Sequence, residues 1–279
     1  MMARSYLFAP GDNEKLLRKA LTAGADAVVF DLEDAVAPAH KVAAREMVTA
    51  VLASLPANAP LIYVRINALS TPDWQDDLAC ATHPRVSGIR IGKAESLAEL
   101  HTLEAALTKL GVAAGLRLFP TIESAVGLLN TAEMARHPRV AGFCFGAADF
   151  VKDIQAESDA DEAATLFARS QLVVISRAAQ LAPPIASVYR HLKDEAGLRA
   201  STLAQRRLGF FGRSCIHPSQ VAVIHEIFTP TSAQLDEARA IVAAVADGQA
   251  AATLANGQFV DAPVVERARQ LIALAERFH

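Results

Sequence analysis

The chain has 279 residues, of which 52% are hydrophobic and 20% are charged. This length suits one large α/β domain or two small ones, and it predicts a sizeable hydrophobic core. Lysine and arginine total 27 against 30 aspartates and glutamates, which gives a formal net charge of −3. The sequence therefore offers no electrostatic footprint for nucleic acid or for an anionic membrane, and any anionic ligand must be held by local groups.

The cysteines favour a reduced, cytoplasmic setting. Cys80, Cys144 and Cys215 are far apart, and none belongs to a C-x-x-C pair that would indicate zinc binding or redox chemistry. The N-terminus has only a short apolar run, and no later segment reaches the roughly 18 apolar residues of a membrane span. We therefore expect a soluble protein that is not exported.

Short β-rich runs alternate with longer helical patterns rich in alanine and leucine, which is the rhythm of β/α units. The first helical patterns cover residues 13–24 and 39–55. The predicted strands cover residues 5–10, 26–34, 60–68, 87–93, 116–123, 140–149, 183–189 and 211–218.

These strands are continuously apolar, which is typical of a parallel sheet covered by helices on both faces. Eight of them favour an α/β fold of the closed (β/α)₈ kind, the TIM barrel, whose typical size is about 250 residues. A doubly wound open sheet is the alternative. The sequence lacks the G-x-G-x-x-G and G-x-x-x-x-G-K-[ST] motifs that are the commonest nucleotide signatures of open sheets.

The pattern changes after residue 229. Two helical patterns, 235–249 and 264–279, flank a short turn-and-strand segment at 256–263. This C-terminal segment is not one of the eight β/α units of the predicted barrel. We predict a barrel domain over residues 1–229 and a C-terminal helical extension over residues 230–279, which packs on the barrel or reaches a neighbouring subunit.

Polar residues end most of the predicted strands, and the carboxyl ends of the strands carry the active site in barrels of this kind. These residues are Asp31, Glu33, Asp34, Arg65, Asn67, Lys93, Glu95, Glu123, Asp149 and His217. A ring of carboxylates that converges with arginine and lysine is costly unless another charge shares the site. For any single acid, a helix cap or a solvated loop is an equal alternative, and we expect Asp12, Ser96 and Ser124 to be caps.

A divalent cation fits this ring. Two carboxylates, with water and substrate completing an octahedron, suit Mg²⁺, whereas zinc would require histidine or cysteine at spacings that the chain lacks. For His217 a hydrogen-bonded structural role is favoured over that of a ligand. Arg65 presents planar donors that match a carboxylate bidentately, and the alternative is an ion pair with a carboxylate of the second strand.

Seven segments follow one another along nearly the whole chain: RSYLFAPGDNEKLLRKALTAGADAVVFDLEDAVAPAHKVAAR, YVRINALSTPDWQDDL, GKAES, PTIESAVGLLN, FGAADF, GRSCIHPSQV and VDAPVVERAR. In this order they resemble the citrate lyase β-subunit-like family, which includes malyl-CoA and citramalyl-CoA lyases and lies within the HpcH/HpaI aldolase superfamily. The resemblance implies a Mg²⁺-dependent barrel enzyme that makes or breaks a carbon–carbon bond beside a thioester, usually as a homotrimer or hexamer.

The resemblance also implies roles for individual residues. Glu123 and Asp149 would be the metal ligands, with Glu123 also beside the substrate. Arg65 would bind the keto-acid carboxylate, and Asp261 would donate a proton in a neighbouring subunit's site. Glu33, Asp34 and Lys93 would surround the metal without binding it directly.

Two positions depart from the family pattern. Its usual P-K-x-E reads Gly92-Lys93-Ala94-Glu95, and Ala186 stands where the seventh strand is expected to carry an aspartate. The second departure bears on the substrate more than on the metal.

The sequence thus predicts a lyase that cleaves citramalyl-CoA or malyl-CoA to acetyl-CoA and pyruvate or glyoxylate. Within the same class, the alternatives are a citrate lyase β subunit, which works on a carrier-bound thioester with partner subunits, and a class II aldolase that uses no CoA. Outside the class, the alternative is a metabolite-binding barrel without catalysis.

Overall fold

The computed structural model of the chain describes residues 2–157, 162–245, 252–253 and 259–278. The chain divides into two compact units, Met1–Ile224 and His225–His279, called here the first and the second unit.

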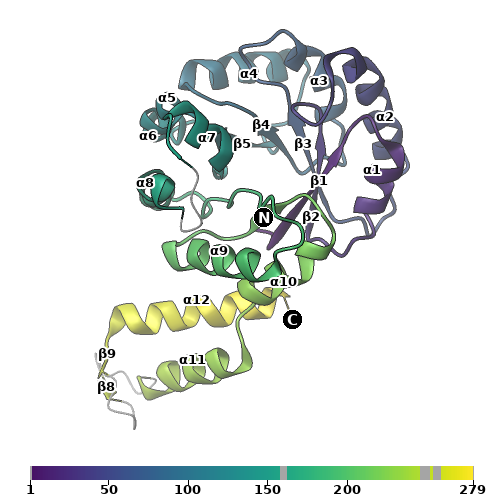
Figure 1. Cartoon of the computed structure of the whole chain (residues 1–279). Helices are drawn as coiled ribbons and strands as arrows, with labels where there is room; N and C mark the ends of the chain where they lie inside the picture. Colours follow the sequence, from purple (N-terminus) through teal and green to yellow (C-terminus); the bar gives the residue numbers. More distant parts are fainter. Residues whose placement is uncertain (1, 158–161, 246–251, 254–258, 279) are drawn as a thin grey trace. The chain divides into compact units, whose positions relative to one another are not determined.

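A parallel sheet forms the centre of the first unit (Figure 1). Its strands are β1 Ser5–Pro10, β2 Ala27–Asp31, β3 Leu61–Ile66, β4 Gly88–Ile91, β5 Arg117–Ile122, β6 Cys144–Phe145 and β7 Arg213–Cys215. They lie in the order β6-β5-β4-β3-β2-β1-β7, and each pairing is parallel. The α/β class and the parallel sheet predicted from the sequence are therefore confirmed.

The seventh predicted strand, residues 183–189, is not a strand in the structure. Two single bridges take its place, one from Ile185 to Cys144 in β6 and one from Ala186 to Arg213 in β7. Pro183 and Pro184 precede the bridges and lack the amide donors that a longer ladder requires. The sheet of the described residues thus has seven strands and a two-residue link, where the sequence predicted eight strands.

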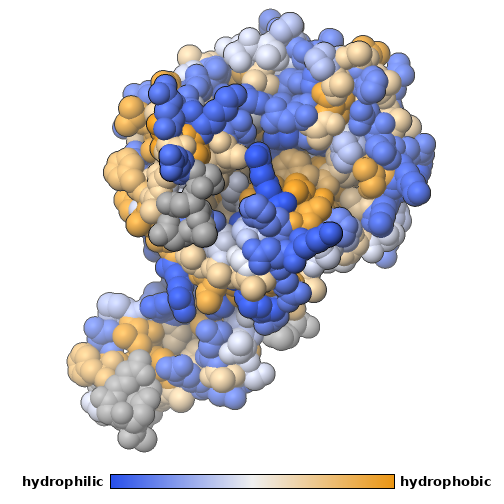
Figure 2. Space-filling model, viewed as in Figure 1, coloured by the Kyte–Doolittle hydropathy of each residue, from blue (hydrophilic) through white to orange (hydrophobic). Residues whose placement is uncertain are grey.

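Helices cover the sheet of the first unit (Figure 1). They are α1 Glu14–Ala20, α2 Lys41–Ala53, α3 Asp73–Ala81, α4 Leu97–Lys109, α5 Ala125–Leu129, α6 Thr131–Met134, α7 Ala147–Asp153, α8 Leu166–Ala178 and α9 Glu195–Leu208. The 3₁₀ helices Pro38–His40 and Ala163–Thr165 precede α2 and α8, and α10 Ser219–Phe228 contains the boundary between the units. Hydrophilic residues predominate over α1 and α2 on the face shown in Figure 2.

Two of the three predicted helix caps, Ser96 and Ser124, are present, and the third helix is capped by a different residue. Ser96 caps α4 in a capping box, and Ser124 caps α5. Asp12 does not cap α1, because Asn13 accepts the hydrogen bond from the amide of Leu16 instead. The Asp12 carboxylate lies 3.1 Å from the ring of His40.

Aromatic side chains fill part of the sheet interior. Tyr63 packs edge to face on Tyr6 and on Phe119, with ring centroids 5.5 and 5.2 Å apart. Cys144 and Ile185 belong to the same buried cluster. The bridging segment is therefore anchored by packing and by its backbone, since the amides of Ile185 and Ala186 both donate to carbonyls of the neighbouring segments.

The second unit is a helical hairpin. It contains α11 Ser232–Ala244, β8 Ala252–Thr253, β9 Phe259–Val260 and α12 Ala262–Phe278, with β8 and β9 paired antiparallel. The two predicted helices are present, and each begins earlier than predicted. Residues 246–251 and 254–258, which complete the predicted segments, lie outside the described residues. None of the described helices is both long and apolar enough to cross a membrane.

Candidate active site

Arg65 is the penultimate residue of β3 and lies beside the end of β2, because the parallel register pairs it with Asp31. Its Nε donates to Asp31 Oδ1 at 2.7 Å, and its Nη2 donates to Oδ2 at 2.6 Å. Its Nη1 lies 2.9 Å from Oε2 of Glu33. Burial disfavours the charge of Arg65, but the neighbouring carboxylates, Asp31 first, raise its pKa. The ion pair considered in the sequence analysis is therefore present, and only the remaining Nη hydrogens of Arg65 are left for a substrate.

Lys93 follows β4 and binds the acids that follow β2. Its Nζ donates to Glu33 Oε1 at 2.7 Å and to Asp34 Oδ1 at 2.8 Å. Glu33 thus lies between two cations, Lys93 at one oxygen and Arg65 at the other. Burial nevertheless raises the pKa of Glu33, so its charge is only partly compensated.

Glu123 follows β5 directly and is 6% exposed. Its Oε2 accepts a hydrogen bond from the backbone amide of Lys93 at 3.0 Å. Burial and the charge of Glu33 raise the pKa of Glu123 to about 7. Its side chain also fills the space beside Gly146, where a Cβ would overlap Oε1 and Cγ of Glu123.

Asp149 lies in the first turn of α7, which starts after Gly146. Ile122 of β5 pairs with Phe145 of β6, and the amide of Gly146 donates to the carbonyl of Ile122 at 3.0 Å. Glu123 and the first turn of α7 consequently lie at the same edge of the sheet. Within the described part of the chain, no hydrogen-bond donor contacts the Asp149 carboxylate.

The oxygens at this edge suit a hard divalent cation. Glu123 Oε1 has no hydrogen-bond donor among the described residues, and burial keeps the pKa of this carboxyl group raised, so a cation would compensate its charge. The residues that the structure describes contain no cluster of three or more histidine, cysteine, aspartate or glutamate side chains that could hold a metal. An ion held by two protein carboxylates and completed by water or substrate is the coordination that Mg²⁺ prefers.

Two further predicted residues, Asp261 and His217, belong to later segments of the chain. Asp261 belongs to the second unit and directly precedes α12. Its Oδ1 accepts a hydrogen bond from the amide of Val264 at 3.2 Å. His217 is exposed and its Nδ1 lies 2.8 Å from Oγ of Ser219, as expected for a structural histidine. The sequence placed Asp31 among the polar residues at the strand ends but did not single it out as the partner of Arg65, and the spatial role of Gly92 and Gly146 was not predicted.

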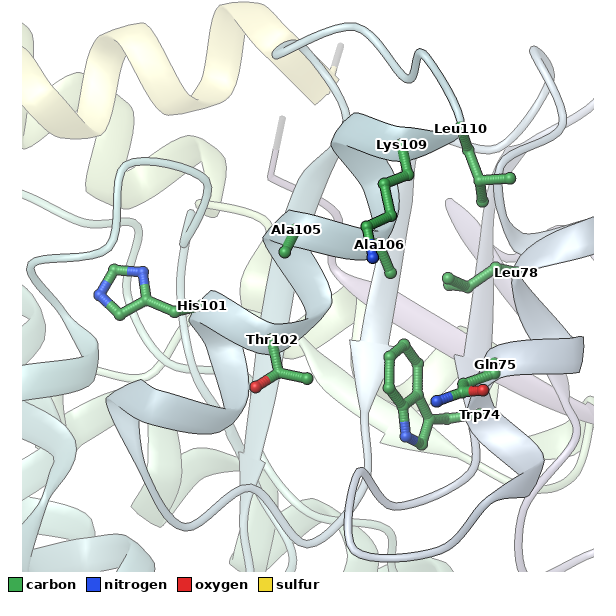
Figure 3. A pocket seen from close by; sticks show the side chains of 9 residues that line it. All are labelled: Trp74, Gln75, Leu78, His101, Thr102, Ala105, Ala106, Lys109 and Leu110. Atoms are coloured by element: carbon green, nitrogen blue, oxygen red, sulfur yellow. The ribbon is translucent and has the colours of Figure 1, made fainter.

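Two of the cavities in the first unit have different linings. One, of about 660 Å³, lies between α3 and α4 and is lined by Trp74, Gln75, Leu78, His101, Thr102, Ala105, Ala106, Lys109 and Leu110 (Figure 3). Its lining contains none of the predicted site residues and no carboxylate, so we do not assign the chemistry to it. The other, of about 880 Å³, is lined in part by Ala147 and Ala148, which directly precede Asp149, and by Ser187.

The fold and the acids at its strand ends agree with a class of carbon–carbon lyases. Residues 164–279 match the model of a family described as C-C bond lyase of the TIM-barrel fold. Residues 4–218 match the model of the HpcH/HpaI aldolase/citrate lyase family, and the chain belongs to this family. It is therefore an enzyme of the lyase type, and the resemblance inferred from its sequence is confirmed.

Similar proteins match the chain from end to end. It is 33% identical to citrate lyase subunit beta of Leuconostoc mesenteroides subsp. cremoris, over 100% of this chain and 95% of that protein. It is also 33% identical to a (3S)-malyl-CoA thioesterase of Cereibacter sphaeroides, over 98% of this chain and 94% of that protein. The crystal structure of CitE from Mycobacterium tuberculosis in complex with magnesium, acetoacetate and coenzyme A superposes with a TM-score of 0.81 at 29% identity, covering 99% of this chain and 98% of that chain.

Proposed function

We propose that this enzyme is a Mg²⁺-dependent lyase that cleaves a β-hydroxyacyl-CoA of the citramalyl-CoA or malyl-CoA type into acetyl-CoA and pyruvate or glyoxylate. The observation that carries the proposal is the buried Glu123 carboxylate, which has one oxygen fixed by Lys93 and the other without a donor among the described residues. The magnesium and coenzyme A of the CitE complex support the choice of metal and substrate class.

Glu123 and Asp149 would hold the metal. When bound, Mg²⁺ polarises the oxygens of the substrate and lowers the pKa of its hydroxyl group. Glu33 and Asp34, which Lys93 and Arg65 hold in place, would bind water around the ion.

Arg65 and Asp261 would act on the substrate. Arg65 stays cationic, and its remaining Nη hydrogens bind the carboxylate that becomes part of the keto acid. In cleavage the hydroxyl group would lose its proton to water and become the carbonyl group of the keto acid, while the electron pair of the broken carbon–carbon bond would move to the α-carbon of the thioester. Asp261 donates a proton to that carbon, and in the reverse condensation it removes the proton.

We further propose a cytoplasmic homo-oligomer, a trimer or a hexamer, in which Asp261 of one copy serves the site of another. The domain assignment of the sequence analysis, a barrel over residues 1–229 and an extension over residues 230–279, belongs to this proposal. The substrates are small molecules, and neither nucleic acid nor membrane takes part.

A panel of thioesters tests the function. Citramalyl-CoA, malyl-CoA and citryl-CoA are incubated with the full-length chain and Mg²⁺, and free keto acid and acetyl-CoA are measured. We expect turnover that EDTA abolishes and Mg²⁺ restores, and metal-independent cleavage would contradict the mechanism.

The same panel separates the alternatives. A citrate lyase β subunit requires a carrier-bound thioester and partner subunits, and a class II aldolase cleaves free hydroxy-keto acids but no acyl-CoA. Release of CoA together with an intact hydroxy acid indicates thioester hydrolysis. Binding of pyruvate without cleavage of any substrate indicates a barrel without catalysis.

A further inference from the structure

The turn after β4 contains two unusual residues, Gly92 and Lys93. A Cβ on Gly92 would overlap all three atoms of the Glu33 carboxyl group. Glu33 can therefore occupy its buried position between Lys93 and Arg65 only because residue 92 has no side chain. Gly92 is also a departure from the family pattern, in which proline is usual.

Lys93 adopts a left-handed backbone conformation with φ of 50°. This conformation costs free energy in any residue except glycine, so the surrounding contacts must hold it. Those contacts are the bonds of its ammonium group to Glu33 and Asp34 and the bond of its amide to Glu123. One strained residue thus contacts three carboxylates that follow two different strands.

We propose that Gly92 and Lys93 are positioning residues of the metal site. Gly92 keeps open the space for Glu33, and Lys93 joins Glu33, Asp34 and Glu123 so that one Glu123 oxygen is fixed and the other stays available to a cation. The inference rests on the proposed function and extends it to residues that do not contact the metal. Partners of this kind hold ligands in orientation, and their loss typically weakens metal affinity by about 10- to 100-fold.

Mn²⁺ serves as the probe, because the electron paramagnetic resonance signal of the free ion reports binding without any substrate. In the full-length chain, Gly92→Ala should raise the Mn²⁺ dissociation constant by about 10- to 100-fold. Gly115→Ala is the matched control, since a Cβ on Gly115 meets nothing within 4 Å, and its dissociation constant should equal that of the wild type.

Lys93→Gly tests the ammonium group, because glycine accepts the left-handed backbone and keeps the amide that binds Glu123. We expect weaker Mn²⁺ binding in Lys93→Gly and recovery of most of the affinity in Lys93→Arg. Gln180→Gly is the control, since Gln180 is exposed and has a similar φ of 57°. A purely structural role predicts no loss in Lys93→Gly, because removal of backbone strain stabilises the fold.

A double-mutant cycle keeps the test decisive if Gly92→Ala folds poorly. Thermal unfolding is measured for Gly92→Ala in the wild-type and in the Glu33→Ala background. The loss of melting temperature should be smaller in the second background, because the carboxyl group that the new methyl group would meet is gone. Equal losses in the two backgrounds overturn the role of Gly92.

The outcomes distinguish this inference from the function on which it rests. If the wild type binds Mn²⁺ and folded Gly92→Ala and Lys93→Gly bind it equally well, the positioning role is wrong and the proposed function stands. If the wild type binds no Mn²⁺ at millimolar concentration, the metal-dependent function fails, and the positioning role fails with it.

Discussion

Lys93 and Glu123 are joined by a hydrogen bond of 3.0 Å from the backbone amide of the first to Oε2 of the second. The ammonium group of the same lysine donates a hydrogen bond to Glu33, which also forms an ion pair with Arg65. The charged side chains at the carboxyl ends of β2, β3, β4 and β5 are thus coupled within one network. A change at one of these positions is therefore expected to affect the others.

In the metal-free protein, Glu123 should make stability depend on pH. Its pKa is about 7 in the folded chain and ordinarily 4.5. Between pH 4.5 and about 7 the folded state keeps a proton on Glu123 that the unfolded state has lost. The protonated carboxyl group therefore stabilises the fold at low pH, and this contribution is lost as the pH rises through the pKa of the folded state. The shift corresponds to about 3 kcal/mol. Urea unfolding in EDTA from about pH 5 to 8 measures it, and Glu123→Gln should flatten the fall. A flat wild-type profile would contradict the prediction.

Arg65→Met should destabilise the fold by roughly 3–5 kcal/mol, because Asp31 and Glu33 would stay buried without their arginine. Arg65→Lys should fall between this variant and the wild type, since an ammonium group cannot reproduce the two parallel bonds to Asp31. Arg18→Met is the control, because Arg18 pairs with the exposed Glu14. Urea unfolding compares the variants, and equal losses at positions 65 and 18 would disprove the structural importance of the Arg65 pair.

Asp261 has a structural role at the start of α12 and a proposed catalytic one, and two variants separate them. Asp261→Ala removes the cap and should cost about 1 kcal/mol, whereas Asp261→Asn keeps an acceptor for the amide of Val264 and should change stability little. As the proposed proton donor, Asp261→Asn should lower kcat by about a hundredfold or more. Thermal unfolding and kcat are measured together. Full activity in a folded Asp261→Asn would leave Asp261 the role of a cap alone.

Gly146→Ala places a methyl group where the Glu123 side chain lies. We expect a destabilisation of roughly 1–3 kcal/mol from overpacking and, since Glu123 must move, weaker Mg²⁺ binding by calorimetry. Gly142→Ala is a matched control, because its nearest contacts, to Ala182, are at an ordinary 3.5 Å. The two variants should differ clearly, and similar Mg²⁺ affinities would show that the close approach at Gly146 does not serve the metal.

The sequence predicted the order of β/α units well where the apolar runs are long, as in β1, β3 and β5. The order of neighbours in a parallel sheet then follows from chain order, so the convergence of charged residues at one edge was predictable. The region around Ile185 was not, because two prolines limit the ladder to one paired residue on each side, although the amides of Ile185 and Ala186 still donate to carbonyls of the neighbouring segments.

The sequence did not predict which side chains of the site pair with one another. Arg65 and Asp31 are 34 positions apart, and only their register in the sheet shows that the arginine fork is used by Asp31. Gly92 and Gly146 look like ordinary turn glycines in the sequence, because their role depends on a carboxylate that approaches from another strand. The cap of α1 was predicted one residue too early because Asp12 and Asn13 are both good capping residues.

The weak link at Ile185 and Ala186 has a consequence for motion. Five residue pairs join β1 to β2, whereas the link has one paired residue on each side, with its two amides hydrogen-bonded to Phe143 and Gly212. Local opening of the sheet should therefore start at this short link, and its amides should exchange with deuterium before those of β2. Ser187, the next residue, accepts a hydrogen bond from the amide of Ala147, the first residue of the helix that carries Asp149. Each such opening would move Asp149, while Glu123 stays held by the amide of Lys93. Ligand exchange would then proceed by release of Asp149 first.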